Sequence, residues 1–84
     1  GIVNYVVPQN ELMEKVNKIA SKISSKGQVA IRMAVKAVVS TEELSQQAGQ
    51  HLEASLFGVC CGSEDFKEGT NAFLEKRKPK FEGK

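Results

Sequence analysis

The chain has 84 residues, of which 40% are apolar and 26% are charged, and its formal net charge is +2. A chain of this length forms one small domain that buries only roughly 60–65% of the surface exposed on unfolding, so we expect it to gain stability from a partner surface. No apolar run approaches the ~20 residues that span a bilayer, and so small a positive charge does not by itself indicate nucleic-acid binding.

The first nine residues predict a strand or extended segment. The stretch IVNYVVP (2–8) is rich in valine and ends at Pro8, which has no N–H with which to extend a ladder. No second strand pattern follows, so we expect the pairing partner to lie outside these residues. The chain also starts at Gly1 without a methionine, and we expect it to be a piece of a longer protein.

A first helix is predicted over residues 10–25. Asn10 suits the N-cap position, and Gly27 suits the left-handed position after the helix end. The apolar residues then recur at spacings of four, three and four, at Leu12, Val16, Ile19 and Ile23. This spacing places them on one helical face.

Two further helices are predicted in the middle of the chain. The second covers residues 28–39 and is rich in alanine, so a neighbouring helix could approach it closely. The third is predicted to follow at once and to run to about residue 61. Ser40 or Thr41 would be its cap, and Glu42 and Glu43 would lie in its first turn, where acids favour the helix dipole.

The fourth predicted helix starts at the cap Ser63 and ends with the basic run 76–78. We expect it to bury Phe66, Thr70 and Phe73. Its acidic start and basic end complement the helix dipole. The sequence therefore predicts an all-α fold of about four helices behind a strand-like lead-in.

The chain contains no recognisable catalytic or metal motif. Cys60 and Cys61 are adjacent and have no second pair to complete a zinc site, so we interpret them as small buried hydrophobic residues. His51 is the only histidine and has no matched nucleophile or co-ligand. We therefore predict no metal site and no catalytic residue in this chain.

Two basic features remain open between a binding and a structural interpretation. Lys15, Lys18, Lys22 and Lys26 could face phosphates, or they could be the solvated flank of a helix. Phe73 and Lys76 lie three residues apart and share a helix face. The aromatic ring of Phe73 could therefore stack on a flat ring of a ligand while the ammonium of Lys76 meets a phosphate of that ligand. The alternative is that the phenylalanine is core and the lysine serves the dipole.

Two stretches resemble a known family. Residues 1–23, GIVNYVVPQNELMEKVNKIASKI, resemble the segment G-[LI]-V-N-x-V-V-P…E-L-M…A that follows the catalytic core of enoyl-CoA hydratases in the crotonase superfamily. Residues 55–84, SLFGVCCGSEDFKEGTNAFLEKRKPKFEGK, are similar to the C-terminal signature of that family, F…[ST]-E-D-x-K-E-G-x-x-A-F-[LV]-E-K-R-x-P-x-F. The resemblance covers the whole chain in order.

The resemblance implies a division of the chain and the place of the chemistry. Residues 1–9 would be a lead-in strand belonging to a missing spiral core, and residues 10–84 would be the helical C-terminal module. The two catalytic glutamates and the oxyanion hole of that family lie in the spiral core, so they are not assigned to Glu42, Glu43 or Glu53.

The resemblance also implies partners and binding residues. The helices would build a homotrimer, or a dimer of trimers, and complete the acyl-CoA pocket of a neighbouring subunit. Phe57, Phe73 and Lys76 match positions that approach coenzyme A, which is the carrier of the thioester substrate; no tightly bound cofactor, nucleic acid or membrane partner is implied. The implied location is the cytoplasm, or the mitochondrial matrix in a eukaryote.

Two alternatives remain at the level of sequence. The same module occurs in isomerases and other acyl-CoA enzymes, and the upstream glutamates would distinguish hydration from those reactions. From another class, the chain could be a free-standing helical adaptor or a nucleic-acid-binding domain that uses the lysines of the first helix, which would show salt-sensitive binding.

Overall fold

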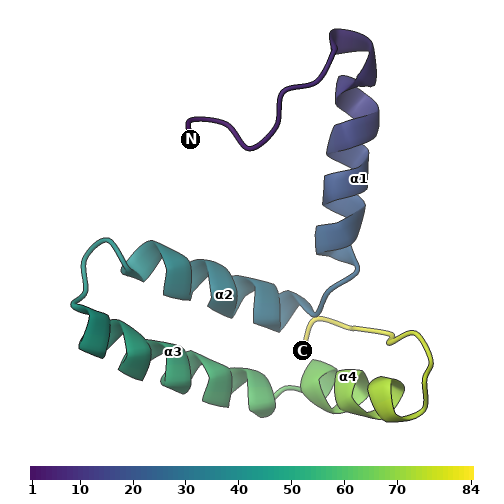
Figure 1. Ribbon diagram of the computed structural model, residues 1–84. Helices are drawn as coiled ribbons and strands as arrows, with labels where there is room; N and C mark the ends of the chain where they lie inside the picture. The colour runs from purple at the N-terminus through teal and green to yellow at the C-terminus, as the bar shows by residue number, and fades with distance from the viewer.

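A computed structural model describes all 84 residues and contains helices but no strand (Figure 1). A short 3₁₀ turn, η1, covers Gln9–Glu11. The α-helices are α1 at Leu12–Ser24, α2 at Gln28–Ser40, α3 at Gln46–Cys61 and α4 at Glu64–Leu74. The predicted all-α class with four helices is confirmed.

The helices form a hairpin with one arm standing away from it. α2 and α3 lie side by side and antiparallel, and α4 continues from the end of α3 (Figure 1). The chain after α4 turns back and ends near the start of α2, whereas α1 projects away from the other three helices (Figure 1). The apolar face of α1 is consequently uncovered, with Leu12 48% and Ile23 49% exposed.

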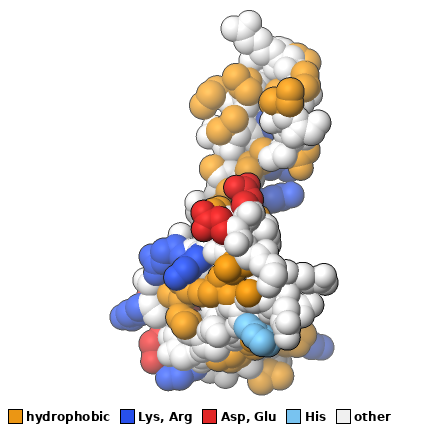
Figure 2. All heavy atoms as spheres, turned by 90° about the vertical axis from the view of Figure 1, so that its left-hand side faces the viewer, with side chains coloured by type: hydrophobic (Ala, Val, Ile, Leu, Met, Phe, Trp, Pro, Cys, Tyr) orange, Lys and Arg blue, Asp and Glu red, His pale blue; other side chains and the backbone are white.

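The buried interior is very small. Only Gly27, Leu56, Asp65 and Ala72 are buried. Figure 2 shows apolar side chains both on the projecting part and across the body below it. Burial of apolar surface is the main favourable term in folding. A partner surface that covered the exposed apolar side chains would therefore stabilise the chain.

The start of the chain is neither helix nor strand over residues 1–8. It contacts α1 through Tyr5, because Nζ of Lys15 lies 4.0 Å from the centre of the tyrosine ring. The pairing of this segment with residues outside the chain stays a prediction.

Two expectations about the first helix are wrong. Asn10 does not act as the cap, because the helix is entered through η1 after Pro8 and no side chain caps it. Gly27 has φ −58° and precedes α2, so it is not in the left-handed region. Gly27 is instead a place of close approach, because a Cβ there would lie 3.5 Å from Oδ2 of Asp65 and 3.7 Å from Cδ1 of Phe81.

The third helix starts later than predicted. α2 extends to Ser40, and the hydroxyl of Thr41 donates to the carbonyl of Val38 at 2.7 Å in the turn that follows. The actual cap of α3 is Ser45, whose oxygen accepts from the amide of Ala48 at 3.3 Å. The segment 42–43 therefore lies in a turn and not in the first turn of α3.

The cap of the fourth helix is confirmed, and its end is corrected. Ser63 accepts from the amide of Phe66 at 3.1 Å. The helix ends at Leu74, so the basic run 76–78 lies beyond it and does not form its last turn. The expected burial of three side chains of this helix is also wrong, because Phe66 is 42% exposed, Phe73 is 82% exposed, and Thr70 is exposed as well.

Candidate functional site

Phe57, one of the three predicted coenzyme A contacts, lies on an apolar groove between α2 and α3. It is 64% exposed. Apolar residues of both helices line the groove beside it, among them Met33, Ala37 and Leu56, and only two polar residues border it. The alanine-rich face of α2 leaves this space open, because small side chains do not fill it.

Phe73, another predicted coenzyme A contact, borders a second groove, where α4 meets the start of α2 and the returning chain. Gly27, Gly69 and Phe81 also line it. The two grooves share Ala30, Cys60 and Phe66. The structure therefore brings Phe57 and Phe73 to neighbouring parts of one apolar surface, although they are 16 residues apart in the sequence.

Lys76 lies outside both grooves and occupies an unusual backbone position. Its φ is +54°, and it is the only residue other than glycine with positive φ. Its amide donates to the carbonyl of Phe73 at 3.3 Å, and the next amide, of Arg77, donates to the carbonyl of Ala72 at 3.0 Å. These two bonds form a Schellman motif, whose left-handed position is usually glycine. The side chain of Lys76 is exposed and forms no ion pair.

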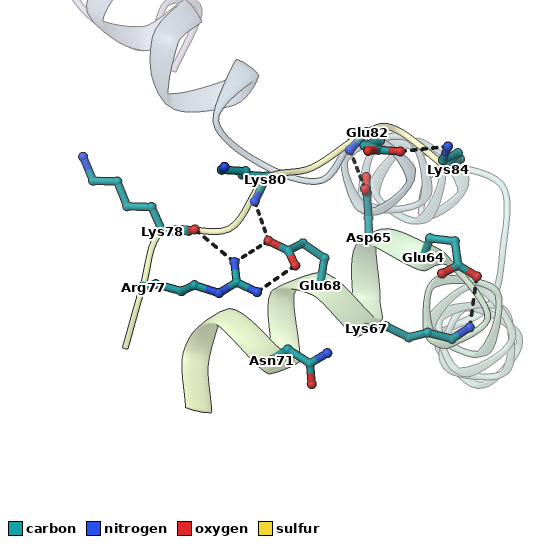
Figure 3. Close-up of a pocket in the computed structure, with 10 residues that line it drawn as sticks. All are labelled: Glu64, Asp65, Lys67, Glu68, Asn71, Arg77, Lys78, Lys80, Glu82 and Lys84. Atoms are coloured by element: carbon teal, nitrogen blue, oxygen red, sulfur yellow. Dashed lines mark hydrogen bonds and ion pairs between the residues drawn. The ribbon is translucent and has the colours of Figure 1, made fainter. Parts of the chain in front are cut away.

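Sequence reasoning missed a charged cleft that lies between α4 and the returning segment (Figure 3). Glu68 stands at its centre. Its two carboxylate oxygens accept from Nη1 and Nη2 of Arg77 at 2.6 and 2.9 Å, and one of them also accepts from the amide of Lys80 at 2.7 Å. This fork geometry is the strong form of the arginine–carboxylate pair.

Asp65 makes the second attachment of the returning segment. It is only 5% exposed, and its carboxylate accepts from the amides of Glu82 at 2.7 Å and Gly83 at 3.0 Å. Its own amide donates to the carbonyl of Lys84 at 2.9 Å. We call the contacts that Asp65 and Glu68 make with residues 77–84 the tail clasp.

The charges of the tail clasp shift two pKa values. Hydrogen bonds from Arg77 and from the amide of Lys80 lower the pKa of Glu68 from 4.5 to about 2. The same carboxylate, together with that of Glu75, raises the pKa of Arg77 above its ordinary value. Both groups are therefore charged at every pH near neutrality.

The remaining candidates are the two cysteines, the single histidine and the lysines of the first helix. Cys60 and Cys61 are free, and they are half-buried rather than buried as expected; Cys60 lines both grooves. His51 is exposed. No group of three or more His, Cys, Asp or Glu side chains is placed to hold a metal ion. None of the lysines of α1 forms an ion pair, and Lys15 lies over the ring of Tyr5. None of the four α-helices combines the length and the apolar character that a bilayer crossing needs.

Comparison with known proteins identifies the class. The sequence model of the enoyl-CoA hydratase/isomerase family matches residues 1–84. The chain belongs to this family.

Individual relatives agree along the whole chain. The chain is 44% identical over 81 residues to the crotonyl-CoA hydratase of Syntrophomonas wolfei, which is 96% of this chain and 31% of that protein. It is 43% identical over 84 residues to the probable mitochondrial enoyl-CoA hydratase of Dictyostelium discoideum, which is 100% of this chain and 30% of that protein.

A solved structure has the same arrangement of helices. The chain superposes on the enoyl-CoA hydratase of Bacillus anthracis with a TM-score of 0.94 and 36% identity, covering 100% of this chain and 33% of that one. The chain thus spans about a third of the length of the relatives it matches.

Proposed function

We propose that this chain is the C-terminal helical module of an enoyl-CoA hydratase, whose complete form adds water to the double bond of a 2-trans-enoyl-CoA. The observation that carries the proposal is the similarity to a crotonyl-CoA hydratase over 96% of the chain. The family description also includes isomerases, so the hydratase assignment depends on two glutamates in the part upstream of Gly1.

The module has two roles in this proposal. It covers its exposed apolar surface by assembling with other copies as a trimer or a dimer of trimers. It also completes the acyl-CoA pocket of a neighbouring subunit. The large exposed apolar area supports the first role, since monomers rarely leave extensive apolar patches uncovered.

Three residues would contact the coenzyme A part of the substrate. Phe57 and Phe73 offer exposed rings on the shared apolar surface, and such rings can stack on a flat heterocycle. Lys76 offers an unpaired ammonium that can meet a phosphate. The resemblance to the family implies that the reaction itself would use groups of the spiral core, which lie outside this chain.

A chimera tests the function. In the crotonyl-CoA hydratase of S. wolfei, the matched 81-residue segment is replaced by the corresponding residues of this chain, and a second variant lacks the segment. We expect the chimera to hydrate crotonyl-CoA and to have the mass of the unmodified assembly, whereas the shortened variant does neither. A chimera of the correct mass without turnover, or a shortened variant with full turnover, would contradict the proposal.

The cellular location follows the parent enzyme. We place it in the cytoplasm, or in the mitochondrial matrix if the source is a eukaryote. The second location is supported by relatives whose names include the word mitochondrial.

A further inference from the structure

The backbone of Lys76 is held in place from both sides. On the helix side, the Schellman bonds fix residues 76 and 77 to the carbonyls of Phe73 and Ala72. A lysine is less stable than a glycine in the left-handed region, because its Cβ crowds the following carbonyl oxygen. Such a position persists only where neighbouring contacts determine it.

Glu68 supplies the contacts on the other side. The fork to Arg77 holds the residue directly after Lys76, and the bond from the amide of Lys80 holds the chain four residues later. Figure 3 shows Glu68 pointing from α4 into the cleft, between the guanidinium of Arg77 and the backbone of Lys80. The turn that carries Lys76 is thus tied back to the middle of α4 by one carboxylate.

The basic run contains side chains that form ion pairs within the chain and side chains that remain free to bind a ligand. The basic run contains Lys76, Arg77 and Lys78, but only the guanidinium of Arg77 is consumed by internal ion pairs, with Glu68 and Glu75. Lys76 and Lys78 form none. By occupying Arg77, Glu68 fixes the turn without neutralising Lys76.

We propose that Glu68 is a positioning residue that acts through Arg77 to hold the ammonium of Lys76 where it meets the phosphates of the acyl-CoA substrate. This inference rests on the proposed function, because it assumes that Lys76 contacts the substrate. Glu68 touches neither the substrate nor the reacting atoms. It works by removing alternative conformations of the turn before the substrate binds, which lowers the entropic cost of binding.

The test uses the complete enzyme that carries this segment. Two substrates are compared, crotonyl-CoA and the crotonyl thioester of pantetheine, which lacks the nucleotide and its phosphates. The variants are Glu68→Gln, Lys76→Ala and the double variant. Glu64→Gln is the matched control, since Glu64 forms an exposed ion pair with Lys67 on the same helix but does not touch the turn.

We expect Glu68→Gln to raise the KM for crotonyl-CoA about fivefold and to leave kcat within about twofold, as for a lost binding contact. The pantetheine thioester should be processed as well as by the unmodified enzyme, and Glu64→Gln should change nothing. Lys76→Ala should give the same loss as Glu68→Gln, and the double variant should be no worse than either single one.

Distinct outcomes overturn the inference and the proposed function. An unchanged KM for crotonyl-CoA in Lys76→Ala would show that Lys76 does not contact the substrate. Three results would show that Glu68 does not act through Lys76. The first is a higher KM for crotonyl-CoA in Lys76→Ala but not in Glu68→Gln. The others are an equal rise in KM for both substrates, and additive effects on KM in the double variant. If Glu68→Gln does not fold, Arg77→Lys keeps the charge, loses the fork, and is expected to give the same selective loss for crotonyl-CoA.

Discussion

The ring of Phe81 lies against Gly69 in α4. A Cβ added at Gly69 would stand 3.3 Å from Cε1 of this ring, and one added at Gly27 would stand 3.7 Å from Cδ1. Two glycines that are 42 residues apart in the sequence therefore make room for the same side chain. This ring, together with the tail clasp, places the last residues of the chain against both α4 and the start of α2.

We expect Gly69→Val to release residues 80–84. The branched side chain would overlap the ring, which cannot shift freely because Glu68 and Asp65 hold the chain on either side of it. The measurement is the rate of tryptic cleavage after Lys80, which should increase severalfold. Gly58→Val is the control, since nothing lies within 4 Å of the position of its Cβ, and equal cleavage in the two variants would contradict the prediction.

Asp65→Asn should weaken the same segment through its hydrogen bonds. The carboxylate accepts from two half-buried amides, but the side chain of asparagine has only one acceptor oxygen, so one of these amides would face the NH₂ group and lose its acceptor. An unsatisfied buried donor costs about 1–3 kcal/mol. Hydrogen exchange of the amides of Glu82 and Gly83 measures this as faster exchange. Unchanged protection at both amides would contradict the prediction.

Because of the ion pair of Glu68, the stability of the tail clasp should fall at low pH. The folded chain lowers the pKa of Glu68 from 4.5 to about 2. Its contribution to stability is therefore complete above about pH 4.5 and is lost as the pH falls toward 2. Carbon-13 NMR of the Glu68 carboxyl should give a midpoint near 2, and in Arg77→Gln the midpoint should rise toward 4.5. A midpoint near 4.5 in the unmodified chain would show that the clasp is absent in solution.

The sequence predicts the helices well because their signals are local. The clearest example is Ser63, whose cap bond reaches only three residues ahead. Local signals also explain why the predicted start of α3 is wrong. Ser40, Thr41 and Ser45 are all good N-cap residues. Only the actual turn, in which Thr41 bonds back to Val38, decides among them.

The tail clasp could not be predicted, because its partners are distant in the sequence. Asp65 looks like an ordinary acid in the first turn of a helix, and its bonds to Glu82 and Gly83 join residues 17 and 18 positions apart. No spacing rule relates a helix acid to a later backbone amide in an irregular segment. The exposure of Phe73 was also missed, because helical periodicity identifies an apolar face but not what covers it.

The exposure of Phe73 leads to a prediction for the complete enzyme. Since the ring is 82% exposed, Phe73→Ala should change the stability of this module by less than about 0.5 kcal/mol. It should raise the KM for an enoyl-CoA severalfold through the loss of stacking. Leu74→Ala is a matched control, because Leu74 is 72% exposed and adjacent but lines neither groove. Equal effects of the two changes on KM would contradict a specific role of Phe73.

Lys76→Gly should lower the affinity for the substrate without lowering the stability of the module. Glycine adopts φ +54° without the steric cost that lysine has, so the temperature of unfolding should rise or stay unchanged. The ammonium is lost at the same time, and the KM for crotonyl-CoA should rise about fivefold, as for a lost charge-assisted contact. Lys78→Gly is the control for loss of a nearby positive charge, since Lys78 lies outside the left-handed position. If Lys76→Gly lowered the unfolding temperature, or left KM unchanged, the strained backbone at residue 76 would not be maintained for substrate binding.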